Sequence, residues 1–360
     1  MGLSNCFYYS NYGNYIQTKG VIWGEKRMRS FLSLRDLVIK NWIFIIILLG
    51  LLIPLITSDQ YILHILILSF ILATLGASWD MLTGYGGLFS FGHQAFYAIG
   101  GYASAIICIN YGISPWLGLL IGGLSALLAS LVISYPVLRL RGPYIALVTL
   151  AFSLVIYEAI TIFRDLTGGP SGLWGIPTFT PIDLGIIKIT FEYTNRTSYY
   201  YLAYALLIIN LIFLKIFVES KYGLRLRVIK ESEEVAETLG IDTIKYKLVA
   251  VLISAFISGL TGAFYAHYIQ LLSPEVAWVS TMLDIVLATM LGGFMTIYGA
   301  FAGSLVISFL KEYFRVIGQL RLVIYGLILI LIIIATPSGL LKEMIVKILS
   351  FKKKVKVKNV

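Results

Sequence analysis

Apolar blocks that are long enough to cross a lipid bilayer recur along the whole chain. They lie at 42–57, 61–80, 93–109, 115–137, 143–163, 200–218, 246–272, 281–291, 297–311 and 321–336. A helix needs roughly 20 apolar residues to cross the hydrocarbon core, and the blocks approach or reach this length. Only 13% of the residues are charged, about half the fraction usual in water-soluble domains. The sequence therefore predicts an all-α polytopic membrane protein with about ten transmembrane helices.

The distribution of lysine and arginine predicts the orientation of these helices. An even number of spans places both termini on one side of the membrane. If that side is the cytoplasm, 22 of the 28 basic residues lie on it or beside it, and 6 lie outside. We therefore expect cytoplasmic N- and C-termini. The cluster from Lys311 to Arg321 breaks the rule, and a re-entrant block within 281–311 would change the count.

The chain divides into an N-terminal tail, a transmembrane domain and a basic C-terminal tail, at 1–41, 42–336 and 337–360. Residues 1–27 are rich in tyrosine and asparagine and have no apolar stretch of the kind found in signal peptides. They are either a disordered tail or lie upstream of a true start at Met28. Within the transmembrane domain we expect an extracytoplasmic loop at 164–199 and a cytoplasmic loop at 219–247. The C-terminal tail favours anionic lipid headgroups.

Several classes of function are disfavoured by composition. Two cysteines and three histidines, scattered along the chain, predict neither a disulfide framework nor a metal site. The basic residues lie between apolar blocks, which indicates a membrane surface and not nucleic acid as the partner. Ser90 and His93 lack the third group of a hydrolytic triad, so an intramembrane enzyme is not expected. No phosphate-binding loop of the Gly-x-x-x-x-Gly-Lys type is present, so the chain has no ATPase site of its own.

Glycine-rich segments interrupt two of the apolar regions, near 84–94 and 292–299. Broken backbone at membrane depth is tolerated only against protein or a watery cavity, and paired interruptions indicate a solute route. The alternative is that these glycines only allow close helix packing or turns. The polar and glycine residues predicted to line the route are Gly86, Gly87, Ser90, Gly92, His93, Gln94, Gly292 and Gly293.

Three acidic residues also fall in or beside the apolar blocks. A charge at the bilayer centre costs at least about 2.5 kcal/mol, so each needs a partner or a function. Asp80 ends its block, where water is close, while Glu158 and Asp284 lie inside theirs. We add Glu158 and Asp284 to the predicted route. A structural ion pair is the alternative for each.

The loop at 219–247 carries a short amphipathic pattern. Apolar or small residues recur at helical spacing, and glycine follows them as a helix terminator, at Val228, Ser232, Val235, Ala236, Leu239 and Gly240. Four acidic residues on the other face disfavour binding to lipid headgroups. The pattern therefore predicts a helix that binds in a groove of another protein.

A series of motifs resembles one transporter family. They are Gly84-Tyr-Gly-Gly-Leu-Phe-Ser-Phe-Gly-His93, Leu138-Arg-Leu-Arg-Gly142, Leu166-Thr-Gly-Gly-Pro-Ser-Gly-Leu-Trp-Gly-Ile-Pro177, Gly223 through Gly240, Ser273-Pro-Glu275 and Tyr325-Gly326. In this order, over roughly 29–341, they resemble the branched-chain amino-acid permeases of ABC importers, of the LivM type. The resemblance implies a multi-pass protein of the cell membrane that forms the translocation pathway.

The same resemblance implies the partners. Glu234-Val235-Ala236, followed by Gly240, is similar to the loop with which importer permeases dock onto their ATPases. We therefore expect ATP-binding subunits that use the ATP, a second related permease and an extracytoplasmic solute-binding protein. The chain itself needs no cofactor.

The solute and the energy source each have an alternative. Similar permeases carry urea, short amides or other amino acids, and Gln94 and His267 differ from what is common in the family. A different class of transporter, a gradient-driven carrier or channel, would use Asp80, Glu158 and Asp284 to couple transport to an ion.

Overall fold

The computed structural model describes residues 59–140, 142–183, 188–191 and 196–314, together with 50–55, 57, 323, 324, 326, 327 and 330. The chain divides into two compact units, 1–57 and 58–360. In the first unit residues 50–55 are helical. The predicted tails at 1–41 and 337–360, and most of the first and last apolar blocks, lie outside the described residues.

Helices make up most of the second unit, and their bounds follow the predicted blocks closely. They are α2 (Gln60–Asp80), α3 (His93–Tyr111), α4 (Pro115–Val137), α5 (Tyr144–Ile162), α7 (Thr197–Glu219), α8 (Lys221–Glu231), α9 (Glu233–Thr238), α10 (Thr243–Ile269), α11 (Val279–Gly292) and α12 (Gly299–Tyr313). Among the described residues five helical segments are long and apolar enough to cross a membrane, and α11 is a shorter apolar helix. The all-α polytopic membrane class is thus confirmed.

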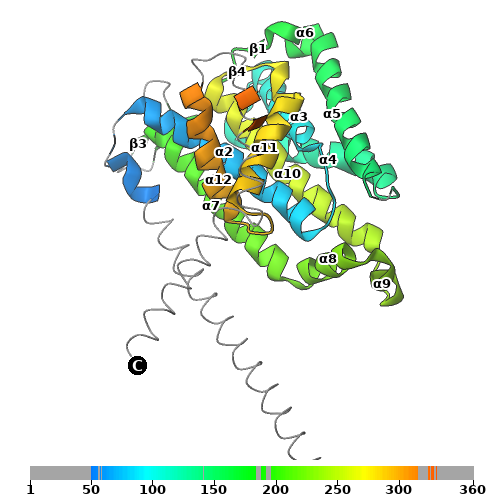
Figure 1. Ribbon diagram of the computed structural model, residues 1–360. Helices are drawn as coiled ribbons and strands as arrows, with labels where there is room; N and C mark the ends of the chain where they lie inside the picture. Colours follow the sequence, from blue (N-terminus) through cyan, green and yellow to red (C-terminus); the bar gives the residue numbers. More distant parts are fainter. Residues whose placement is uncertain are drawn as a thin grey trace, which may run out of the picture. The chain divides into compact units, whose positions relative to one another are not determined.

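Short elements connect the helices at one end of the unit. Helix α6 (Arg164–Thr167) and the 3-10 turn η2 (Gly169–Ser171) lead into β1 (Leu173–Trp174), which pairs antiparallel with β4 (Leu271–Leu272). Strands β2 (Ile182–Asp183) and β3 (Lys188–Ile189) form a second antiparallel pair, and the 3-10 turn η3 (Pro274–Ala277) precedes α11. Figure 1 shows β1, β4 and α6 at the end opposite to α8 and α9.

Glycines allow α3, α4 and α10 to touch through their backbones. A Cβ atom added to Gly100 would lie 2.2 Å from the carbonyl oxygen of Gly259, and one added to Gly122 would lie 2.6 Å from that of Gly100. These distances are shorter than any real Cβ contact. Small residues at helix interfaces are the usual means of close packing in membranes, because lipid supplies no hydrophobic drive between helices. The three helices thus form a tight group.

Helix α2 is the most enclosed span and α5 the least. In their most apolar windows, 78% of the residues of the α2 span are buried and only 17% of those of α5. Helix α2 packs against α7, α10, α11 and α12, while α5 has its few contacts with α3, α4 and the turns near η3. Most of α5 is therefore available to lipid or to another subunit.

Candidate transport site

Helix α2 does not end at Asp80. It continues through a π-helical turn, η1 (Met81–Tyr85), so the combined segment runs from Gln60 to Tyr85. The Asp80 side chain is fully buried, and the expectation that it lies at a span end close to water is wrong. The physical reason is tertiary: a later part of the chain covers the carboxylate and supplies it with a hydrogen bond.

The covering segment is the turn between α11 and α12, which belongs to the second glycine-rich region. The backbone N–H of Met295 donates to Asp80 Oδ1 at 2.8 Å, and the Tyr85 hydroxyl donates to the Met295 carbonyl oxygen at 2.7 Å. The Trp79 and Phe294 rings lie 6.1 Å apart. The two glycine-interrupted segments, far apart in the sequence, are therefore in direct contact.

The residues that follow η1 fold back against α2 before α3 begins. Trp79 Nε1 donates to the carbonyl oxygen of Ser90 at 2.8 Å, and the Thr83 hydroxyl donates to that of Leu88 at 2.9 Å. The N–H of Phe91 donates to Thr149 Oγ1 on α5 at 2.9 Å. The segment thus lies between α2 and α5, and Gly92 caps the start of α3.

The first two residues of α3 are buried polar side chains with incomplete hydrogen bonding. His93 Nε2 is 2.5 Å from the hydroxyl of Ser254 on α10, but His93 Nδ1 has no partner among the described residues. Both side-chain polar atoms of Gln94 also lack a partner there. Unpaired buried polar atoms are rare in folded proteins, because each costs free energy, and those that persist need an explanation.

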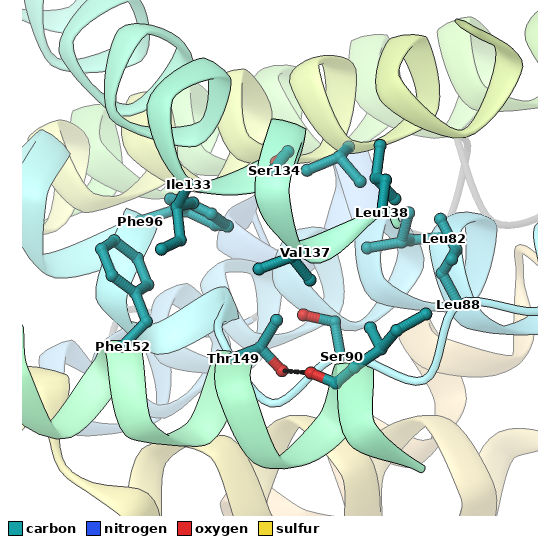
Figure 2. Close-up of a pocket in the computed structure, with 12 residues that line it drawn as sticks. Leu82, Leu88, Ser90, Phe96, Ile133, Ser134, Val137, Leu138, Thr149 and Phe152 are labelled. Atoms are coloured by element: carbon teal, nitrogen blue, oxygen red, sulfur yellow. Dashed lines mark hydrogen bonds between the residues drawn. The ribbon is translucent and has the colours of Figure 1, made fainter. Parts of the chain in front are cut away.

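A small apolar cavity lies beside this segment. Figure 2 shows Phe96 and Phe152 at one side of it and Leu82 and Leu88 at the other, with Ser90 and Thr149 between them. Its volume is about 20 Å³, enough for about one water molecule. In this conformation the cavity is therefore closed to an organic solute.

A much larger cleft opens on the side of α8 and α9. Its volume is about 640 Å³, within the range of small-molecule sites. Residues of 86–89, Phe91, the α4–α5 connection and the helices α5, α8, α9 and α10 line it. Four of the lining residues are charged: Lys230, Glu231, Glu233 and Lys247. Lys247 forms an ion pair with Glu233 at 2.6 Å. Predicted route residues Gly86 and Gly87 thus border an open cleft, and Ser90 borders the closed cavity.

The predicted amphipathic helix in the loop 219–247 is in fact two helices. Ser232 ends α8 in an extended conformation and caps α9, its hydroxyl accepting from the Val235 N–H at 3.3 Å. The prediction of one continuous helix is wrong, because a serine side chain competes for backbone hydrogen bonds and favours a cap. The predicted end is confirmed: Gly240 has φ 75°, and the N–H groups of Gly240 and Ile241 bind the carbonyls of Glu237 and Ala236.

The predicted docking residues divide into exposed and buried ones. Glu234, Val235, Leu239 and Gly240 are exposed, with exposed fractions of 53% for Val235 and 67% for Leu239. Ala236 is fully buried within the chain, and Val228 is half-buried. Helix α9 therefore presents two large apolar side chains outward.

The remaining predicted route residues lie elsewhere. Glu158 is exposed on α5, and Asp284 pairs with Lys311 at 2.5 Å across α11 and α12. Gly292 packs against the start of α12, where an added Cβ would lie 1.7 Å from the carbonyl oxygen of Gly299. Gly293 has φ 119° and begins the turn to α12. Gly292 thus allows α11 to approach the start of α12, and Gly293 allows the turn between these two helices.

Sequence reasoning considered Asp80 only as a group near water or an ion-coupling group, and it missed the other residues that join the two segments: Tyr85, Lys230 and Met295. A local signal existed for Asp80, which precedes Gly84 by one helical turn and lies on the same face of a helix. Nothing local indicates Met295, since its role depends on a contact with a residue 215 positions away. Among the described residues no group of His, Cys, Asp and Glu is placed to hold a metal ion.

Comparisons with known proteins match this sequence to one family. Residues 61–334 match the family described as the permease component of branched-chain amino acid transport systems. The high-affinity branched-chain amino acid permease LivM of Escherichia coli K12 is 28% identical over 290 residues, which cover 76% of this chain and 68% of LivM. The nucleoside ABC transporter permease NupC of Lactococcus lactis is 29% identical over 255 residues, 65% of this chain and 76% of NupC.

An archaeal relative is more distant. The probable branched-chain amino acid permease LivH of Methanocaldococcus jannaschii is 23% identical over 254 residues, 68% of this chain and 78% of LivH. No solved structure matches the chain. With the family match over most of its length and five apolar helices able to span a bilayer, the chain is a multi-pass permease of the cell membrane. It belongs to the family of permease components of branched-chain amino acid transport systems.

Proposed function

We propose that this permease subunit of an ABC importer forms the pathway for branched-chain amino acids, with ATP hydrolysed by separate subunits. About ten helices cross the membrane, both termini are cytoplasmic, and the end that carries α8 and α9 faces the cytoplasm. The excess of lysine and arginine in that loop and in the α4–α5 connection supports this orientation.

The observation that carries the proposed route is the unpaired polarity at the start of α3. His93 and Gln94 are fully buried, and three of their polar atoms have no partner in the part of the chain that the structure describes. An amino acid carries a carboxylate and an ammonium group that can use such atoms. The solute passes along 86–94 once the closed cavity beside Ser90 widens. Gly292 and Gly293 border the route from the α11–α12 side, and the ion pair of Asp284 with Lys311 joins these two helices beside it.

The partners follow from the exposed surfaces. The ATP-binding subunits dock on α9 through Glu234, Val235, Leu239 and Gly240, since large apolar side chains exposed on a polar loop indicate a protein interface. Val228 and Ala236 support that surface from within. A second related permease covers α5, where Glu158 is exposed among apolar side chains and would be costly to leave in lipid. A solute-binding protein delivers the solute at the opposite end.

Uptake into proteoliposomes tests this function. The chain is reconstituted with its partner permease, with or without the ATP-binding subunits. Uptake of ¹⁴C-labelled leucine is then measured, with the solute-binding protein added on the side of the membrane opposite to the ATP-binding subunits. We expect uptake only with ATPase subunits and ATP. Uptake that follows a proton or sodium gradient without ATP would replace the importer with a gradient-driven carrier.

The choice of solute has its own test. Unlabelled valine and isoleucine are expected to compete with leucine for the solute-binding protein and for uptake. Nucleosides, urea and short amides serve as the comparison set, with nucleosides included because a nucleoside permease is among the relatives. Competition by guanosine and not by valine would assign the chain to nucleoside transport.

Docking on α9 is tested by placing a charge on its exposed apolar residues. Val235→Asp and Leu239→Asp are each expected to weaken binding of the ATP-binding subunits at least about tenfold, because a buried unpaired charge at an interface costs several kcal/mol. Lys245→Asp, at an exposed position at the start of α10, is the matched control. Copurification at wild-type levels for both α9 variants would rule out this docking surface.

A further inference from the structure

The buried carboxylate of Asp80 fixes the turn between α11 and α12. Its Oδ1 accepts from the N–H of Met295, which has φ 62°, a left-handed conformation that residues with a side chain rarely adopt. Gly84 leaves the space for this carboxylate: a Cβ atom at Gly84 would lie 2.3 Å from Asp80 Oδ1. The turn is therefore held in a strained form by the last residue of α2.

A second bond fixes the same turn from the other side of Met295. The Tyr85 hydroxyl donates to the Met295 carbonyl oxygen at 2.7 Å. Both backbone groups of Met295 are thus bound by residues of the α2–η1 segment. A rotation of η1 must carry the turn with it or break two hydrogen bonds.

Helix α8 is attached to this assembly by contacts on one face. Lys230 packs on Gly87, where an added Cβ would lie 3.2 Å from Lys230 Cβ and 3.3 Å from its Cα. Lys230 Nζ lies 3.0 Å from the sulfur of Met295 and 5.8 Å from the centre of the Phe294 ring. One turn earlier, the Arg227 guanidinium lies 5.0 Å from the centre of the Tyr85 ring. A cation placed over the face of an aromatic ring is attracted to it, so these contacts bind α8 to both glycine segments.

We propose that Asp80, Tyr85, Met295 and Lys230 form a coupling joint that transmits the movement of α8 to both glycine segments at once. The proposal rests on the proposed function, in which a partner moves α9 and α8. The break at Ser232 separates the docking helix α9 from α8, and the joint links α8 to 84–92 and 293–298. These four residues are positioning residues, and the solute need not touch them.

The unpaired atom of Asp80 agrees with a joint that changes its contacts. Asp80 Oδ2 makes no hydrogen bond of ordinary length among the described residues, although the side chain is fully buried and the backbone N–H of Thr296 also lies near the carboxylate. A second donor can bind there in another conformation of the transporter. A purely structural carboxylate is expected to use both oxygens.

The test measures solute uptake per ATP hydrolysed in the reconstituted complete transporter. Tyr85→Phe removes only the hydroxyl that binds Met295, and Lys230→Met removes the ammonium but keeps the chain that packs on Gly87. Each is expected to lower uptake per ATP about fivefold to tenfold, the effect of losing one hydrogen bond or cation–π contact. Binding of the ATP-binding subunits is expected to stay within about twofold of wild type. Lys221→Met, exposed at the start of the same helix, is the control and should leave the ratio unchanged.

A variant that carries both Tyr85→Phe and Lys230→Met distinguishes a single joint from two independent contacts. In a single joint, the double variant Tyr85→Phe with Lys230→Met loses less than the product of the single losses, because the second change acts on a link already broken. Wild-type ratios for both single variants, or losses that multiply, would overturn the joint. Failure of the wild-type complex to take up solute with ATP would instead contradict the proposed function.

Discussion

His93 and His267 are both fully buried, yet their surroundings differ in hydrogen bonding. His267 Nε2 is 2.9 Å from the hydroxyl of Ser104, and its Nδ1 is 2.7 Å from the carbonyl oxygen of Pro177. His93 uses one nitrogen, and the neighbouring Gln94 uses none among the described residues. His267 joins the segment that contains Pro177 to α3 and α10. His93 leaves one ring nitrogen without a partner among the described residues.

This difference in hydrogen bonding indicates different roles for the two regions around His267 and His93. A completed network around a buried polar residue fixes one structure, whereas a partly completed one costs free energy that function must justify. The His267 end therefore holds the fold. The end with His93, Gln94 and Asp80 is the one that we expect to rearrange during transport.

The largest effect on stability is expected at the His267 end. His267→Ala removes two hydrogen bonds, leaves the Ser104 hydroxyl and the Pro177 carbonyl without the ring, and opens a cavity beside Phe179, whose ring centre lies 5.4 Å away. The loss should be about 3 kcal/mol. Thermal unfolding in detergent measures it. Uptake per folded transporter should stay within about twofold of wild type. A large loss of uptake at unchanged stability would instead assign the role in transport to the His267 region.

A smaller effect, of opposite sign, is expected at Gln94. Gln94→Leu replaces an unpaired buried amide by an apolar side chain of similar size, so stability should rise by about 1 kcal/mol. Solute uptake should fall at the same time, because the proposed route loses a polar group. Stability and uptake are measured together for this variant. A loss of stability would mean that the Gln94 amide is hydrogen-bonded in the native protein.

The smallest effect is expected at the ion pair between α11 and α12. Lys311 is about half exposed, and such pairs contribute less than about 1 kcal/mol. Lys311→Gln should therefore change thermal stability and uptake only slightly. A loss of uptake of tenfold or more, measured as for the wild type, would place Asp284 in the route as a functional carboxylate whose partner matters.

Local sequence patterns predicted most of the helices correctly. Pro115 begins α4 and Gly240 ends α9, because proline at a first helical turn and glycine after the last one act through their own backbone preferences. Periodicity also predicted a helix in the loop 219–247, which we propose as the docking helix, but not its division at Ser232.

The contacts of the proposed joint could not be predicted in the same way. No local pattern indicated the π-helical continuation of α2, and the hydrogen bond that Asp80 accepts comes from Met295, which reaches it only in the folded chain. Likewise, the sequence left a route and close helix packing as alternatives for Gly292 and Gly293, and only the folded chain reveals that Gly292 packs against Gly299. Glu158 and Asp284 look alike in sequence, and only packing separates an exposed carboxylate from a paired one.

Accessibility of single cysteines compares the two ends most directly. In a background of Cys6→Ser and Cys108→Ala, Gln94→Cys and Ser104→Cys place one thiol at each end, and both native side chains are fully buried. The reconstituted transporter is treated with a water-soluble maleimide, with and without ATP and solute. Modification of the thiol in Gln94→Cys only during ATP turnover, with the one in Ser104→Cys protected throughout, is the predicted result. Protection of Gln94→Cys during turnover, or equal modification of both variants, would contradict the account.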